Sequence, residues 1–265
     1  MIIIGEKINS SRRQIAEAIA SGDRNFIQNE AKIQSDAGAD YIDVNAAAFM
    51  EKETEYLKWI IEAVQEVTDL PLCIDSPDPE VIKKVISLVK KPPMIINSIT
   101  LEPSRLDGIL PLVLDYRATV IGLCQTGNRM GRSAAEKVEI AGRLIEKVTS
   151  AGIRIDALYV DPLVFPVGAD SNSACATLDA IEEIMKQFKG VHTVCGLTNV
   201  SHGLPNRKLV NRTFLAEAVA RGLDAAILDP SDKQLLGALR AALMLMGKDE
   251  YCMGYIKAFR KGLLA

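Results

Sequence analysis

The chain has 265 residues, of which 48% are hydrophobic and 25% charged, which is enough to bury the core of one barrel domain spanning residues 1–265. Its 31 Lys and Arg against 34 Asp and Glu give a net charge of −3, which argues against nucleic acid or an anionic membrane as partner. No apolar stretch reaches the roughly 18 residues of a membrane helix. The opening run MIIIGEK is too short for an export signal, so we expect a strand there and a cytoplasmic protein.

Short apolar runs alternate with segments of helical periodicity along the whole chain. The predicted strands are Ile2–Ile4, Tyr41–Val44, Leu72–Ile74, Met94–Ile96, Val120–Leu123, Leu158–Val160, Thr193–Gly196 and Ala225–Leu228. The predicted helices are Arg12–Ser21, Asn25–Ala37, Thr54–Val67, Glu80–Val89, Arg105–Tyr116, Ala134–Ala151, Thr177–Phe188, Thr213–Arg221 and Lys233–Met246, with an amphipathic segment Tyr251–Leu264 at the end. This alternation predicts an α/β fold, a (β/α)₈ TIM barrel. A doubly wound open sheet is the alternative, weakened because no GxGxxG follows the first strand.

Polar residues stand at the ends of the predicted strands. They are Asp43, Asn45, Asp75, Asn97, Asp161 and Asn199. The carboxyl ends of parallel barrel strands share one face, where active sites are built. Taken singly, each has a structural alternative, as when an acid caps the next helix or starts a turn. Together they predict one polar binding site at the barrel mouth.

Other kinds of site fit the sequence poorly. The five cysteines include no CxxC pair and are expected to be small buried residues, and the two histidines are too few for a His-based zinc site. Lys7 is the sole lysine near a strand end and lies outside the predicted strand, which disfavours a Schiff base. Asp229-Pro-Ser-Asp232, after the eighth strand, is acidic where barrel phosphate sites usually lie. No metal is predicted on this chain.

A pterin suits the predicted mouth. Its guanidine-like edge presents N–H donors that a carboxylate can accept, and its carbonyl and ring nitrogens suit amides. A hydrogen bond with one charged partner contributes roughly 1.5–3 kcal/mol. Two or three such bonds plus stacking would hold the ring at micromolar affinity, which is a binding free energy of about 8 kcal/mol.

The motifs resemble a known family over essentially the whole chain. They are IIIGEKIN, DYIDVNAA, LCIDS, MIINS, LYVDPL, GLTNVSHGLPNR and NRTFLAEAVARGLDAAI. In this order they resemble the methyltetrahydrofolate:corrinoid methyltransferases, pterin-binding barrels that exchange a methyl group between N5 of tetrahydrofolate and the cobalt of a corrinoid. Dihydropteroate synthase and the folate module of cobalamin-dependent methionine synthase are more distant relatives.

The resemblance implies a role for each matching residue. Asp75, Asn97 and Asp161 would bind the pterin, and Asn199 would reach N5 as the catalytic amide. Asp43, Asn45 and Ser201 would line the same pocket. Arg207 would orient the ligand or, as we slightly prefer, fix its loop.

The resemblance also implies partners. The corrinoid (cobalamin) would arrive on a separate corrinoid protein, because no DxHxxG-like motif is present, and a homodimer is expected. Two features depart from the family pattern: Ala46-Ala-Ala after Asn45, and the basic loop Gln125–Arg132. In that loop, Arg129 and Arg132 are candidates for docking the partner, with an ordinary solvated loop as the alternative.

Two alternatives and one question of direction stay open at this point. A dihydropteroate synthase would couple a pterin pyrophosphate to p-aminobenzoate, and it would need cations for the pyrophosphate. A pterin-binding subunit without turnover would only dock to a corrinoid protein. The sequence sets neither the direction of methyl transfer nor the original methyl donor.

Overall fold

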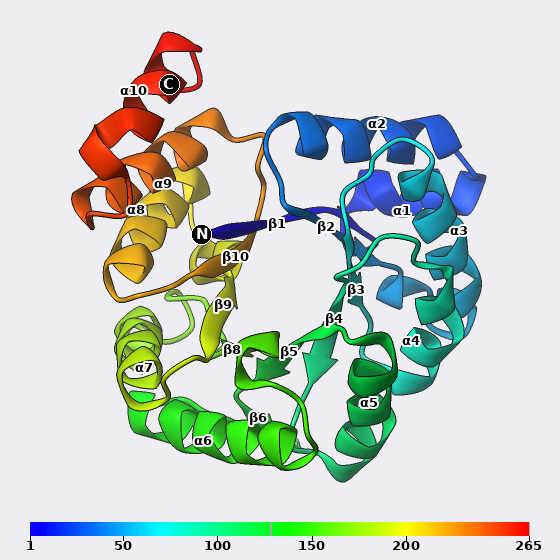
Figure 1. Cartoon of the computed structure of the whole chain (residues 1–265). Helices are drawn as coiled ribbons and strands as arrows, with labels where there is room; N and C mark the ends of the chain where they lie inside the picture. The colour runs from blue at the N-terminus through cyan, green and yellow to red at the C-terminus, as the bar shows by residue number, and fades with distance from the viewer. Residues whose placement is uncertain (128, 265) are drawn as a thin grey trace.

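The computed structural model describes residues 1–127 and 129–264 of the chain. Within these residues, eight parallel strands close into a barrel in the order β1-β10-β9-β8-β5-β4-β3-β2, with helices packed around the outside (Figure 1). The strands are β1 (Ile2–Asn9), β2 (Tyr41–Asn45), β3 (Leu72–Asp75), β4 (Ile95–Ile99), β5 (Thr119–Leu123), β8 (Leu158–Asp161), β9 (His192–Gly196) and β10 (Ala225–Leu228). The predicted (β/α)₈ barrel is therefore confirmed.

The outer helices follow the predicted segments closely. They are α1 (Arg13–Ser21), α2 (Arg24–Asp36), α3 (Glu53–Gln65), α4 (Pro79–Val85), α5 (Pro103–Tyr116), α6 (Ala134–Ser150), α7 (Ser173–Gln187), α8 (Arg207–Ala220), α9 (Lys233–Leu245) and α10 (Met253–Arg260). Short 3₁₀ turns are η1 (Ala47–Lys52), η2 (Ile86–Leu88), η3 (Ile155–Ala157), η4 (Leu197–Ser201) and η5 (Glu250–Cys252). Helix α8 begins six residues before the predicted Thr213, because exposed Leu209 obscures the apolar periodicity of its first turn.

The barrel interior explains where the mouth residues come from. A lower layer of buried side chains fills the barrel: Ile4, Cys73, Ile95, Ile121, Tyr159, Val194 and Ala225. Strand side chains alternate between faces, so the residue two positions further along each strand also points inward, one layer nearer the mouth. Those residues are Glu6, Asp75, Asn97, Leu123, Asp161, Gly196 and Ile227, and all of them line the cavity at the mouth. Because of this period of two, the apolar layer is followed, one step nearer the mouth, by a layer that contains the polar residues Glu6, Asp75, Asn97 and Asp161.

Strand β1 is longer than predicted. The sequence pattern ends the strand at Ile4, whereas the structure continues it to Asn9 and pairs Ile8 and Asn9 with β2 across an irregularity in the register. Glu6 and Lys7 are therefore strand residues, although the apolar run that predicts the strand ends before them. This extension brings Glu6 to the mouth.

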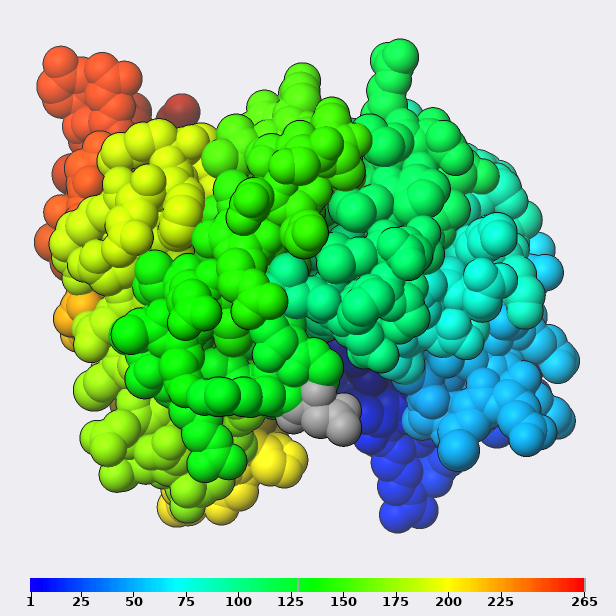
Figure 2. All heavy atoms as spheres, turned by 90° about the horizontal axis from the view of Figure 1, so that it is seen from below, coloured from blue at the N-terminus to red at the C-terminus, as the bar shows by residue number. Residues whose placement is uncertain are grey.

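The loop after β5 folds back on itself as a small hairpin, β6 (Gln125–Thr126) and β7 (Arg129–Met130), which was not predicted. Asn128, at its tip, lies outside the described residues. Near the C-terminal end of the chain, an orange-to-red segment protrudes from the rounded body (Figure 2). Phe259, on α10, is exposed.

Two smaller expectations can be compared with the structure. The expectation that the cysteines are buried is confirmed for Cys73, Cys124 and Cys195 but is wrong for Cys175 on α7 and Cys252 in η5, which are exposed. Among the described residues, no helix combines the length and the apolar character that crossing a bilayer requires.

Candidate functional site

A cavity of about 640 Å³ opens at the carboxyl ends of the strands. Five of the predicted site residues line it together: Asp43, Asp75, Asn97, Asp161 and Asn199. They come from four different strands and from the turn after a fifth, and only barrel closure makes them neighbours. Asn45, Ser201 and Arg207 do not line this cavity, and each instead contacts the groups that form its wall.

Asn45 lies behind Asp75. Its Nδ2 donates to Asp75 Oδ2 at 3.0 Å, while its Oδ1 accepts from Ser10 Oγ at 2.9 Å and from Ala47 N at 3.0 Å. The side chain is therefore fully used inside the protein. It fixes the orientation of one Asp75 oxygen and leaves the carboxylate to meet a ligand.

Burial sets the charge state of the three mouth carboxyl groups. It raises the pKa of Asp75 to about 6 and that of Asp161 to about 6. Burial, and next the charge of Asp75, raise the pKa of Asp43 well above its ordinary value. Oδ1 of Asp43 has no hydrogen-bond partner among the described residues, although the carboxyl group is buried. With pKa values of about 6, Asp75 and Asp161 are expected to be mostly ionised at neutral pH.

Lys137 supports Asp161 from below. Asp161 Oδ1 accepts from Leu163 N at 2.7 Å, and the loop that contains Leu163 is held by the Lys137 ammonium. Lys137 Nζ donates to Pro162 O at 2.7 Å, to Leu163 O at 2.6 Å and to Thr177 Oγ1 at 3.0 Å. Burial lowers the pKa of Lys137 to about 8. Sequence reasoning missed this residue, since a lysine in an amphipathic helix normally faces solvent.

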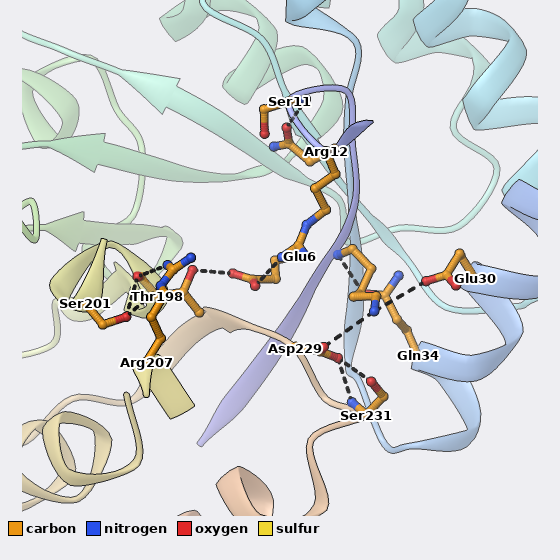
Figure 3. A network of polar contacts seen from close by, with 12 residues as sticks. Glu6, Ser11, Arg12, Glu30, Gln34, Thr198, Ser201, Arg207, Asp229 and Ser231 are labelled. Carbon is orange, nitrogen blue, oxygen red and sulfur yellow. Dashed lines mark hydrogen bonds and ion pairs between the residues drawn. The ribbon is translucent and has the colours of Figure 1, made fainter. Parts of the chain in front are cut away.

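The turn η4 carries Asn199 and is held by Arg207. The Arg207 guanidinium donates from Nε to Ser201 Oγ at 3.1 Å and from its Nη2 to Thr198 O at 2.8 Å (Figure 3). Ser201 is fully buried. These contacts favour the loop-fixing role for Arg207 that the sequence suggested, and they give Ser201 the same role.

A polar chain connects β1 to this turn. Glu6 accepts a hydrogen bond from Thr198 Oγ1 at 3.1 Å, and its other oxygen pairs with the Arg12 guanidinium (Figure 3). Burial raises the pKa of Glu6, and the Arg12 charge opposes that shift. Both residues line the cavity. The apolar run that predicts the strand ends at Ile4, so the sequence singles out neither residue, although the alternation Ile2, Ile4 continues by one more step to Glu6.

Arg105 is a further residue that the sequence did not single out. It lies on α5, lines the cavity and donates to Ser98 O at 2.7 Å and to Pro77 O. Its guanidinium thereby ties together the loops that follow Asp75 and Asn97. In the sequence, Arg105 is a basic residue in the first turn of a predicted helix, and such a residue does not by itself indicate a site.

The side chains that line this cavity can form hydrogen bonds with a polar ligand. Carboxylates and amides converge on it, and the described residues contain no group of three or more His, Cys, Asp or Glu that could hold a metal ion. Asn199 and Glu6 lie on one wall, and Asp75 and Asn97 come from adjacent strands of another, where Asp75 pairs with Asn97 in register. A ligand held by the second wall would present its opposite edge to the first.

Comparisons with known proteins agree with this geometry. A family model described as "Pterin binding enzyme" matches residues 6–229. The chain is 38% identical over 264 residues to a methylcorrinoid:tetrahydrofolate methyltransferase of Eubacterium limosum, covering 99% of this chain and 97% of that protein. It is 30% identical over 244 residues to methionine synthase of Mycobacterium leprae, but it spans only 20% of that protein's length.

Solved structures share the fold at low sequence identity. A dihydropteroate synthase of Coxiella burnetii in complex with pteroic acid superposes with a TM-score of 0.71 at 18% identity, with 94% of each chain covered. One of Xanthomonas albilineans with 4-aminobenzoic acid gives 0.69 at 19% identity, covering 93% of this chain and 92% of that one. The resemblance expected from the motifs is confirmed: this chain belongs to the pterin binding enzyme family.

Proposed function

We propose that this protein is a methyltransferase that moves a methyl group from a methylated corrinoid protein to N5 of tetrahydrofolate. The observation that carries the proposal is the 38% identity, over nearly the whole of both chains, to a protein named for that reaction. The cavity adds chemical support, because carboxylates and amides suited to a pterin converge in it. The name of that relative favours this direction over the reverse.

Binding of the pterin would depend on the wall of the cavity that carries Asp75 and Asn97. A carboxylate of Asp75 or Asp161 accepts from the amino and ring N–H groups of the pterin, and Asn97 both donates and accepts. A hydrogen bond with one charged partner contributes about 1.5–3 kcal/mol. Asn45 and Arg105 hold this wall in place, so little reorganisation is needed when the ring enters.

The transfer step places demands on the opposite wall. N5 of tetrahydrofolate carries one hydrogen and a lone pair. The lone pair attacks the methyl carbon, the N5–carbon bond forms, the cobalt–carbon bond breaks, and its electron pair stays on cobalt. The N5 proton must then leave. Asn199 can accept that N–H through its amide oxygen, which directs the lone pair toward the open mouth, and the Glu6 or Asp161 carboxylate can take up the proton through water.

The direct test mixes the protein with methylcob(III)alamin and tetrahydrofolate and follows the cobalt absorbance. We expect conversion to cob(I)alamin with formation of methyltetrahydrofolate. Asn199→Ala should lower the rate by about 10²–10³ while tetrahydrofolate binding falls much less. Binding of folate without turnover by the wild-type protein would indicate a pterin-binding subunit instead.

The dihydropteroate synthase alternative has less support. The solved structures with that activity share the fold alone at 17–20% identity. The loop after β10 is acidic, and Asp232 already caps α9 by accepting from Gln234 N and Leu235 N. A pyrophosphate would meet carboxylates there, which opposes its binding.

Partner and assembly are further parts of the proposal. The hairpin with Arg129 stands beside the mouth and is our candidate surface for the corrinoid protein, although Arg129 also pairs with Glu136 at 2.6 Å. We propose a homodimer as well, for which Tyr251 (84% exposed) and Phe259 (69% exposed) offer apolar surface. Light scattering of the wild type and of Phe259→Glu tests the dimer. A wild-type protein with the mass of a monomer, unchanged in the variant, contradicts it. The cytoplasmic location stays a prediction.

A further inference from the structure

Lys137, near the start of α6, is a buried cation without a counter-ion. Its side chain is completely buried. Its hydrogen-bond partners among the described residues are two backbone carbonyl groups and a hydroxyl group, and none of them is a carboxylate. Lysine is rarely buried in this way, because removing an ammonium group from water costs free energy. The position of Lys137 therefore points to a use for its charge.

The geometry around Nζ fits an ammonium group and does not fit a neutral amine. Nζ lies 2.7 Å from Pro162 O, 2.6 Å from Leu163 O and 3.0 Å from Thr177 Oγ1. An ammonium group has three N–H donors, one for each of these oxygens, whereas a neutral amine has two donors and a lone pair. The Thr177 hydroxyl already donates to Leu163 O at 3.1 Å, so its proton is not free to meet that lone pair. Loss of the proton from Lys137 therefore removes a hydrogen bond from this cluster.

The loop that these bonds hold has a strained backbone. Leu163 has a φ of 61°, in the left-handed region that residues with a Cβ rarely adopt. Such a conformation persists only where the surrounding contacts hold it in place. Here the carbonyl groups of Leu163 and of Pro162 before it both accept from Lys137. Deprotonation of Lys137 would therefore allow Leu163 to leave this conformation.

Leu163 in turn orients a carboxylate of the candidate site. Its N–H donates to Asp161 Oδ1 at 2.7 Å, and Asp161 lines the cavity at the mouth. Burial raises the pKa of Asp161 to about 6, while the Leu163 N–H and the charge of Lys137 oppose that rise. A displaced Leu163 would leave Asp161 without its fixed orientation and would make it harder to ionise.

The surroundings of Lys137 allow its charge to change just above neutral pH. Burial lowers the pKa of Lys137 to about 8, and the nearby Asp161, Cys124 and Asp170 oppose this shift. Burial also raises the pKa of the Cys124 thiol, which therefore stays neutral in this range. The remaining close contact is the ring of Phe165, whose centroid lies 5.3 Å from Nζ and which attracts a cation.

We propose that protonated Lys137 is a positioning residue for Asp161 and that full affinity for tetrahydrofolate requires this proton. The inference rests on the proposed function, in which Asp161 binds the pterin. Lys137 would not touch the ligand, because its ammonium group acts through the backbone of Leu163. Affinity should be greatest between the pKa of Asp161, about 6, and the pKa of Lys137, about 8.

The experiment measures the dissociation constant of tetrahydrofolate by calorimetry between about pH 7 and about pH 9.5, with circular dichroism to show that each protein is folded. Wild type should bind about fivefold more weakly at pH 9 than at pH 7. Lys137→Met should bind about tenfold more weakly than wild type at pH 7, as expected for one hydrogen bond to a charged group, and should change little up to pH 9. Lys147→Met, at an exposed position of the same helix, is the control and should follow wild type at every pH.

Two further measurements test the proton while keeping the lysine. Thr177→Val removes one acceptor at almost constant shape, so it should move the loss of affinity to lower pH by about one unit. The 13Cε resonance of Lys137, identified by its absence in Lys137→Met, reports the protonation of the amine directly. It should titrate about one pH unit higher when tetrahydrofolate is bound, which is the same tenfold preference for the charged form.

The outcomes separate this proposal from the proposed function. Equal affinity of wild type at pH 7 and at pH 9 would overturn the role of the Lys137 proton and leave the pterin site intact. A parallel loss of affinity in Lys137→Met would also overturn it, since the titrating group would then be another one. A Lys137 resonance that titrates at the same pH with and without tetrahydrofolate has the same meaning, and it decides the matter even if Lys137→Met does not fold. If wild type does not bind tetrahydrofolate at pH 7, the proposed function itself fails.

Discussion

Gly196 offers the sharpest test of the role of Asn199. It is the last residue of β9, with φ −72° and ψ 85°, a conformation open to alanine. A Cβ at this position would lie 3.0 Å from Asn199 Nδ2. Gly196→Ala therefore leaves the backbone unstrained and acts on one neighbouring amide.

The size of the effect follows from this contact. Ordinary contact begins at 3.4 Å, so the Asn199 amide must move by about 0.4 Å. A misplacement of about 1 Å costs about 10²-fold in rate, and 0.4 Å scaled in the exponent gives about sixfold. Complete loss of the amide in Asn199→Ala should cost about 10²–10³. We expect Gly196→Ala to lower the transfer rate about five- to tenfold with little change in tetrahydrofolate affinity.

The assay is single-turnover cobalt absorbance, with calorimetry for binding. Gly168→Ala is the control, because its Cβ would meet nothing nearer than Leu204 Cδ2 at 3.5 Å. In an Asn199→Ala background the added methyl has no amide to displace, so Gly196→Ala should have almost no further effect there. The same fold loss in both backgrounds, or full activity of Gly196→Ala, would refute the reasoning.

Three more changes test the supports of the site. Burial raises the pKa of Asp161 to about 6 from an ordinary 3.8, so the contribution of this carboxyl group to stability is full below about pH 3.8 and is lost as pH rises through about 6. Asp161→Asn should therefore increase the free energy of unfolding by about 1–3 kcal/mol at pH 8, yet it should abolish folate binding. Urea denaturation that shows no gain at pH 8 would contradict this. Lys137→Met should lose about 2–4 kcal/mol in the same measurement, against about 0.5 kcal/mol or less for exposed Lys147→Met on the same helix, and equal losses would deny the buried clamp. Arg207→Met should slow transfer about tenfold with folate affinity within about threefold, because it loosens the turn that carries Asn199; a larger loss in calorimetry would instead indicate direct ligand contact.

Some residues of the site can be predicted from the local sequence pattern, and others cannot. Asp75, Asn97 and Asp161 were found because each ends an apolar run, and the period of two in a strand puts every second side chain on the inside. Asn199 was found by its motif. Asn45 and Arg207, which support them, were also predicted, whereas Glu6, Arg105 and Lys137 were not. Lys137 reads as a surface lysine of an amphipathic helix until the loop after β8 is seen to fold over its ammonium.

Alternation of strand and helix, set by side-chain periodicity within each segment, was enough to specify a parallel barrel and the polar residues at its mouth. Closure of that barrel decided the rest, because contacts such as Glu6 with Thr198 join positions 192 residues apart. No periodicity of a segment encodes such a pair. Whether a polar side chain lines the cavity, as that of Asp43 does, or lies behind its wall, as those of Asn45 and Ser201 do, depends on neighbours that only the folded chain supplies.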